Sequence, residues 1–191
     1  EVLSPTYGAT VLRCRQTEPR PMRYRRLRID GGAYFFTLVT HQRRRILASG
    51  AACDLLLEVI EAVRARHPFE QDAFVLLPDH IHVLWQLPAG DSDFSTRWML
   101  IKSQFRRVYG KRIGAGSEPV WQPRFWEHWI DSDRNYFEHL EYIHSNPVRH
   151  GLARRPIDWR YSSFHEFVRR GDYPADWSVD FAPGDRKRRG E

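Results

Sequence analysis

Hydrophobic residues recur along the chain in two spacings, every second residue in some segments and every third or fourth in others. The first spacing is typical of strands and the second of helices. Aromatic and β-branched residues after Gly31-Gly32 predict a first strand, and His67-Pro68 predicts the end of a first helix. In chain order, the predicted elements are a strand at 33–40, a helix at 51–66, strands at 69–77 and 80–87, a helix at 95–109, a strand at 124–130 and a helix from about 133 to 145.

This order of elements predicts an α+β fold. The succession β-α-β-β-α-β-α is that of a ferredoxin-like split βαβ antiparallel sheet with helices on one face, followed by a C-terminal helix. Serine is a favoured helix cap, so we expect Ser95 to cap the second helix and Asp131-Ser132-Asp133 to cap the last one.

The periodic part of the chain indicates one domain with two appendages. The 191 residues suit a single compact domain, which we place at 22–177. Residues 1–21 lack hydrophobic periodicity, and we expect them to be a disordered N-terminal extension. Residues 178–191 are predicted to form a basic C-terminal tail.

Composition points to a phosphate-rich partner. The net charge is +6, and only three of the 30 basic residues are lysines. Arginine has a planar fork that suits phosphate oxygens, so this bias favours a nucleic acid. Two cysteines are too few for a disulfide framework, and no apolar run approaches the ~20 residues of a membrane span. We therefore expect a cytoplasmic protein with no membrane partner.

The segment at 77–85 contains a His-Ile-His motif in a predicted strand. Side chains alternate between the two faces of a strand, so His80 and His82 point the same way, opposite to Ile81 and Val83. Two imidazoles at this spacing can converge on one divalent cation. An isolated pair of this kind is more often a pair of ordinary surface or hydrogen-bonded histidines.

The last predicted helix adds a second candidate group. Its apolar stripe consists of Tyr136, Phe137, Leu140 and Ile143, and Tyr142 falls roughly 150° from the centre of that stripe. Tyr142 is therefore expected to be exposed or to face a site. Asn146 follows one turn later on the same face, provided that Pro147 does not end the helix before it.

A tyrosine beside a two-histidine metal site suggests phosphoryl transfer. A divalent cation can polarise a scissile phosphate, and a tyrosine hydroxyl can then attack phosphorus. Asn146 would supply a further oxygen ligand. Mg²⁺ or Mn²⁺ suits phosphate and carbonyl oxygens, although two imidazoles would also suit Zn²⁺.

Together these motifs resemble the single-tyrosine transposases that carry a histidine-hydrophobic-histidine motif, and within them the REP-associated tyrosine transposases. The resemblance covers most of residues 22–177. The matching segments are 22–27, 34–37, 77–85, 95–98, 101–102, 121–128, 142–148, 150–152, 159 and 161–164.

By that resemblance, His80 and His82 are metal ligands, Asn146 is the polar ligand and Tyr142 is the catalytic tyrosine. The resemblance implies cleavage and rejoining of single-stranded DNA at palindromic REP-like hairpins, through a 5′-phosphotyrosine intermediate. It also implies a monomer or a homodimer.

The surface that would bind DNA is predicted from charge. Arginines near the start of the domain, after the first strand and off the apolar stripe of the second helix are candidates for phosphate contacts. The candidates are Arg23, Arg25, Arg26, Arg43, Arg44, Arg45, Lys102, Arg106 and Arg107. Of Trp121, Trp126 and Trp129, we expect at most one to stack on a base.

Two alternatives remain open from the sequence. One is a nickase of the replication-initiator or relaxase type, which shares the chemistry but generally carries additional domains. The other is a non-catalytic module for single-stranded nucleic acid on the same sheet. The second alternative predicts aromatic residues on an open sheet face and no covalent adduct with DNA.

Overall fold

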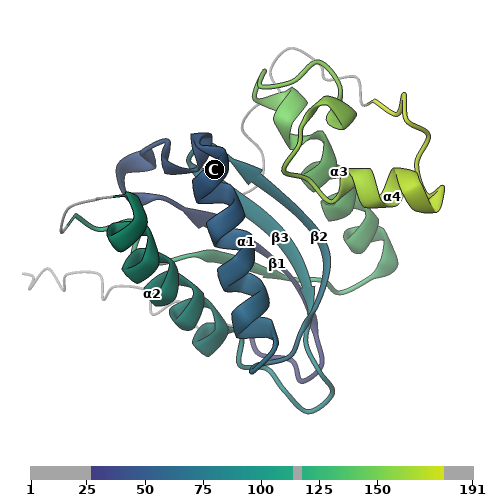
Figure 1. The fold of residues 1–191 in the computed structure, drawn as a ribbon. Coiled ribbons are helices and arrows are strands. Elements are labelled where there is room, and N and C mark those ends of the chain that lie inside the picture. Colours follow the sequence, from purple (N-terminus) through teal and green to yellow (C-terminus); the bar gives the residue numbers. More distant parts are fainter. Residues whose placement is uncertain (1–26, 114–117, 179–191) are drawn as a thin grey trace, which may run out of the picture.

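The computed structural model describes residues 27–113 and 118–178. Figure 1 shows a curved sheet with helices on both sides. The α+β class and the predicted order of elements are confirmed. The strands and α-helices are β1 (Ala33–Val39), α1 (Gly50–Arg64), β2 (Glu70–Leu77), β3 (His80–Gln86), α2 (Phe94–Ile113), β4 (Trp126–Trp129), α3 (Asp133–Arg149) and α4 (Phe164–Arg170), with 3₁₀ turns η1 (His41–Arg43), η2 (Ile46–Ala48) and η3 (Pro156–Asp158).

The sheet has the strand order β2-β3-β1-β4, and every neighbouring pair is antiparallel. This is the order of the predicted split βαβ motif, in which β3 inserts between the first two strands. The central pair aligns Thr37 with His82 and Val39 with His80. The tight turn at Pro78-Asp79 therefore sets the histidine motif at the start of a central strand.

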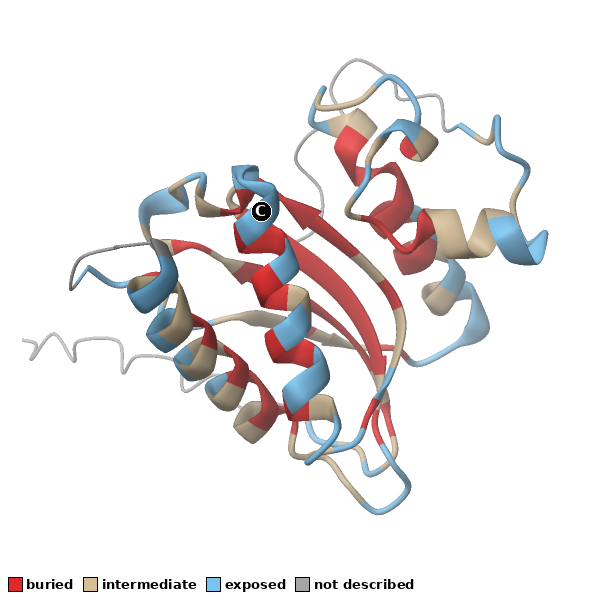
Figure 2. Ribbon diagram, in the orientation of Figure 1, coloured by how far each residue is buried: buried red, intermediate tan, exposed pale blue. Residues whose placement is uncertain are grey.

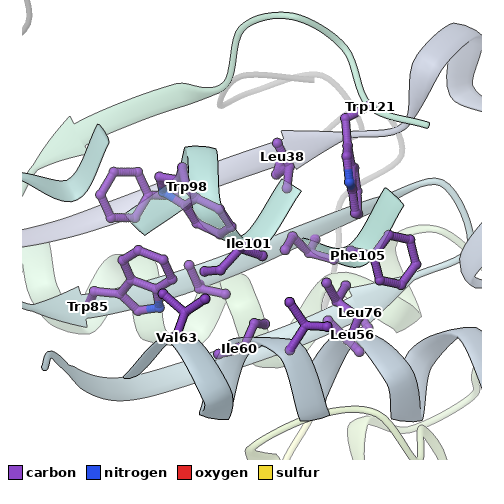
Figure 3. Close-up of a cluster of buried hydrophobic side chains, with 14 of the residues drawn as sticks. Leu38, Leu56, Ile60, Val63, Leu76, Trp85, Trp98, Ile101, Phe105 and Trp121 are labelled. Carbon is purple, nitrogen blue, oxygen red and sulfur yellow. The ribbon is translucent and has the colours of Figure 1, made fainter. Parts of the chain in front are cut away.

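Helices α1 and α2 cover one face of the sheet and form the larger core with it (Figure 3). Alternate residues of β3, including Ile81 and Trp85, point into this core. The Trp85 and Trp98 rings stack with centroids 4.3 Å apart and join β3 to α2. Burial of such large rings stabilises this layer.

Helix α3 packs against the opposite face of the sheet. Leu140 and Ile143 are buried there with Phe35 and Leu84, and Figure 2 shows the buried inner side of this helix. The predicted apolar stripe is wrong at Phe137, which is 58% exposed. The buried residues of α3 all fall within 139–147, so its burial is concentrated in the turns after Phe137.

Two predictions about helix ends have different outcomes. Ser132 caps α3 as expected, with its side chain accepting a hydrogen bond from the Asn135 amide. Ser95 does not cap α2, because it lies inside the helix, and Asp93 Oδ1 instead accepts from the Thr96 amide at 3.1 Å. An aspartate three residues before that amide serves the same function as a serine would.

The segment after α3 closes the outer edge of the sheet. The Leu76 amide donates to the Tyr161 carbonyl and the Ser163 amide to the Phe74 carbonyl, both at 2.9 Å. The Ser163 hydroxyl also lies 2.9 Å from His144 Nε2 on α3. This segment therefore links α3 to the edge strand β2 through hydrogen bonds.

Some sequence predictions lie outside the described residues. These are the extension at 1–21, the tail after Ser178, and the candidate DNA contacts Arg23, Arg25 and Arg26. Among residues 27–113 and 118–178, none of the helices combines the length and apolar character needed to cross a membrane.

Candidate active site

Strand β3 places both histidines of the motif on the sheet face turned away from α1 and α2. The intervening Ile81 points into the α1/α2 core, as the alternation of a strand requires. The His80 and His82 rings have centroids 4.9 Å apart, and both side chains are buried. They are close enough to share one ligand.

One nitrogen of each imidazole is held by a neighbouring side chain. His82 Nδ1 lies 2.9 Å from the Thr37 hydroxyl, and His80 Nδ1 donates to an Asp79 carboxylate oxygen 2.6 Å away. The Nε2 atoms of both histidines are buried and have no hydrogen-bond partner. A histidine that donates through Nδ1 presents a lone pair at Nε2, which is the usual arrangement of a metal ligand.

Neighbouring positive groups lower the pKa of Asp79, and burial, ahead of neighbouring charge, lowers the pKa of His82. Burial alone would raise the pKa of Asp79, but the hydrogen bonds and positive charges of His80 and Arg43 outweigh it and lower that pKa to about 2. Burial lowers the pKa of His82 well below its ordinary value, and positive charge at His80 and His150 lowers it further. A neutral imidazole is the form that binds a metal.

Helix α3 brings the predicted tyrosine to these histidines. The Tyr142 side chain is 5% exposed, and its ring centroid lies 5.2 Å from that of His82 and 5.8 Å from that of Phe35. The helix continues through Pro147 to Arg149, so Asn146 keeps its predicted place one turn after Tyr142. Tyr142 is therefore buried beside His82 rather than exposed, and its assignment as a site residue stays a prediction.

Unpartnered buried polar atoms gather on these residues. Besides the two Nε2 atoms, Oδ1 and Nδ2 of the fully buried Asn146 have no hydrogen-bond partner. Each such atom costs about 1–3 kcal/mol when it is left without a partner, so these atoms are candidates for contact with a ligand. Two imidazoles and one amide oxygen are a donor set that a divalent cation accepts.

A metal centre of a more common kind is not present in the described part of the chain. Nowhere in residues 27–113 and 118–178 do three or more His, Cys, Asp or Glu side chains form a group that could hold a metal ion. Two imidazoles alone leave most of the coordination positions of a divalent cation to other donors.

The end of α3 and the residue that follows it contribute two residues that the sequence reasoning missed. The Arg149 guanidinium carbon lies 5.2 Å from the centroid of the Tyr142 ring, and the His150 ring lies 5.2 Å from that of His80. Helical spacing could have found Arg149, because a residue seven positions after Tyr142 shares its face. His150 follows the helix, so no periodicity indicates its place.

Of the three tryptophans considered for base stacking, only Trp126 lies on the site face. Its strand pairing aligns it with Thr37, and its ring contacts Phe35 at 5.7 Å. Trp121 is buried in the α1/α2 core and Trp129 packs against it. The remaining prediction of a base contact thus applies to Trp126.

The basic residues predicted to bind DNA are divided between two faces. Arg43 lies beside the site, where its guanidinium contacts Asp79 at 3.2 Å. Arg44 donates to the Pro119 carbonyl, and Arg45 is exposed in the same loop. The candidates Lys102, Arg106 and Arg107 are on α2, on the opposite face of the sheet, and the Lys102 ammonium donates to the carbonyls of Gln122 and Pro123.

Comparisons with known proteins agree with this geometry. The chain is 44% identical over 166 residues to the REP-associated tyrosine transposase of Escherichia coli K12, an alignment that covers 85% of this chain and 96% of that protein. The chain belongs to the REP-associated tyrosine transposases. It is thus a transposase-type protein, and the family resemblance stated from its motifs is confirmed.

Two further comparisons support membership in this transposase family. A Haemophilus influenzae protein that carries the same name provisionally is 40% identical over 165 residues, covering 81% of this chain and 92% of its own. A solved structure of a REP-associated tyrosine transposase bound to a REP hairpin has a TM-score of 0.78 at 42% identity and covers 90% of this chain and 99% of that one. No protein-family model matches the chain.

Proposed function

We propose that this protein cleaves and rejoins single-stranded DNA at palindromic REP-like hairpins, with Tyr142 as the nucleophile and a divalent cation as cofactor. The observation that carries the proposal is the position of the Tyr142 ring, 5.2 Å from that of His82. That histidine, with His80 and Asn146, has buried polar atoms without partners. A nucleophile beside an unfilled donor set is the arrangement that metal-assisted phosphoryl transfer needs.

The residues that would hold the cation are His80, His82 and Asn146, through the two Nε2 atoms and the amide oxygen. When bound, Mg²⁺ or Mn²⁺ would polarise the scissile phosphate and offset the charge that develops on it. Asp79 and Thr37 would hold the two imidazoles in the orientation that ligation requires.

The covalent step follows from the nature of the nucleophile. The Tyr142 oxygen forms a bond to phosphorus, the bond from phosphorus to the 3′ oxygen breaks, the phenol loses its proton and the 3′ oxygen gains one. The products are a 5′-phosphotyrosine ester and a free 3′-OH. Because the ester conserves the energy of the broken bond, attack by a 3′-OH can reverse the step and rejoin DNA.

The hairpin substrate is proposed from the relatives. The structural relative is bound to a REP hairpin, and it covers nine-tenths of this chain at 42% identity. The arginine-rich composition suits the same kind of ligand. A non-catalytic module that binds bases on an open sheet is disfavoured, because Leu140 and Ile143 of α3 pack on the face where the bases would stack.

A covalent trapping experiment tests the proposal. Wild-type protein, incubated with Mn²⁺ and an end-labelled hairpin oligonucleotide with single-stranded flanks, should give a denaturant-stable protein–DNA species. Tyr142→Phe should give none, although it should bind the hairpin nearly as well, because only a hydroxyl is lost. Removal of the metal with EDTA should also abolish the species.

Tyr136→Phe is the matched control, since Tyr136 is on the same helix but donates to Asp72, away from the two histidines. It should form the adduct at the wild-type rate. An undiminished adduct with Tyr142→Phe would refute the assignment of the nucleophile.

A further inference from the structure

The end of α3 places a permanent positive charge over the proposed nucleophile. Arg149 is half-buried, and its guanidinium carbon lies 5.2 Å from the centroid of the Tyr142 ring. Tyr142, Asn146 and Arg149 follow one another at intervals of four and three residues, so they form one stripe along the helix. The proposed nucleophile, the proposed amide ligand and this guanidinium therefore face the same side.

The backbone fixes the end of the helix that carries Arg149. The His150 amide donates to the Asn146 carbonyl at 3.0 Å, and the Gly151 amide to the Val148 carbonyl at 2.9 Å. Gly151 has a φ of +67°, a left-handed conformation that ends helices and favours glycine. Arg149 is thus the last residue of a firmly terminated helix, and its side chain starts from a defined position.

A phosphate at the C-terminal end of α3 needs a nearby cation to be bound favourably. The C-terminal end of a helix carries partial negative charge, which disfavours a phosphate nearby. A phosphodiester brought to Tyr142 would meet the Arg149 guanidinium as a positive group that lies against the nucleophile itself.

We infer that Arg149 is a further catalytic residue, which contacts a non-bridging oxygen of the scissile phosphate. The inference rests on the proposed function of Tyr142. A guanidinium suits this role because its fork matches two phosphate oxygens and it keeps its proton throughout. While the Tyr142 oxygen binds phosphorus and the 3′ oxygen leaves, Arg149 transfers no proton and stabilises the charge on the equatorial oxygens.

Cleavage rates of Arg149 variants provide the first test. Arg149→Gln should lower the rate of adduct formation at saturating DNA and Mn²⁺ by roughly 10²–10³-fold, as does loss of one donor to a developing anion. Arg149→Lys keeps the charge but not the fork, and its rate should fall between those of wild type and Arg149→Gln. Arg134→Gln is the matched control, since Arg134 is 90% exposed at the start of the same helix and should not affect the rate.

A second test separates phosphate contact from a structural role. In a Tyr142→Phe background, which keeps the ring beneath the guanidinium but cannot cleave, hairpin DNA with a neutral methylphosphonate at the scissile position should bind more weakly than ordinary DNA. The measured quantity is the dissociation constant for methylphosphonate DNA divided by that for ordinary DNA. Adding Arg149→Gln should bring this ratio close to one. If the glutamine variant does not fold, Arg149→Lys should lower the ratio in part.

The two ideas fail in different ways. If wild-type protein forms no adduct at all, the proposed function is wrong. If wild-type protein forms the adduct and Arg149→Gln forms it equally fast, or if the methylphosphonate ratio is the same with and without Arg149, the inference about Arg149 is wrong while the role of Tyr142 stands.

Discussion

Single residues around the histidine motif illustrate how strongly one side chain depends on another. His80 is oriented by Asp79, and Asp79 is in turn contacted by Arg43. Gln42 and Arg43 both have a left-handed φ, of 54° and 51°, a conformation that costs free energy in residues other than glycine. The turn at these two residues places the Arg43 guanidinium against the carboxylate that holds a proposed metal ligand.

At this scale we predict that Asp79→Asn weakens metal binding. The asparagine amide oxygen can still accept a hydrogen bond from His80, but it lacks the charge that makes the imidazole a stronger ligand. The Mn²⁺ concentration needed for half-maximal cleavage should rise about 10–100-fold, as for other residues that support metal ligands. A titration of adduct formation against Mn²⁺ measures it.

Asp176→Asn, at an exposed position in the segment after α4, is the control and should leave the Mn²⁺ requirement unchanged. An equal Mn²⁺ requirement in wild type and Asp79→Asn would show that the carboxylate does not support the metal site.

At the scale of elements, α3 is the component that assembles the site. Its later turns are held between the sheet and the chain segment that includes Ser163, which lies 2.9 Å from His144. Leu140 and Ile143 attach it to the sheet, while Phe137 on the same helix remains exposed. The strength of this attachment sets how precisely Tyr142 is placed.

We therefore predict opposite outcomes for two apolar residues of α3. Ile143→Ala should lower the free energy of unfolding by about 2–5 kcal/mol, because it leaves a cavity between the helix and the sheet. Phe137→Ala should change it by less than about 0.5 kcal/mol, because that ring is mostly in solvent. Urea unfolding at neutral pH measures both, and a large loss from Phe137→Ala would contradict the packing of α3.

At the scale of the whole molecule, the sheet separates two layers of different character. One face carries α1, α2 and the larger apolar core, and the other carries the histidines, α3 and the proposed chemistry. The net charge of +6 is that of the whole chain, and the candidate DNA contacts are on different faces, with Arg43 beside Asp79 and Arg107 on α2.

The salt dependence of hairpin binding should distinguish these two faces. Each lost phosphate contact reduces the slope of log K against log salt concentration by about 0.7–1. We predict this reduction for Arg45→Gln, and the matched variant Arg107→Gln on α2 should show it only if the DNA also reaches the opposite face. An unchanged slope for Arg45→Gln would remove that loop from the interface.

Much of this protein was determined by its sequence alone, because the relevant information is local. Alternation along a strand fixes that His80 and His82 share a face, and helical periodicity fixes that Tyr142 and Asn146 do. Both hold in the structure, as does the order of strands and helices. The error at Ser95 also has a local cause, since Asp93 competes as the cap, whereas the exposure of Phe137 depends on which turns of α3 the sheet covers.

Only the tertiary structure decided which elements meet. No local pattern states that α3 packs on the face away from α1 and α2, or that this places Tyr142 beside His82, about 60 residues earlier in the chain. The contact of Thr37 with His82 became visible in the same way. Contacts between distant elements depend on how whole faces pack against one another, and periodicity within one element carries no information about its partner.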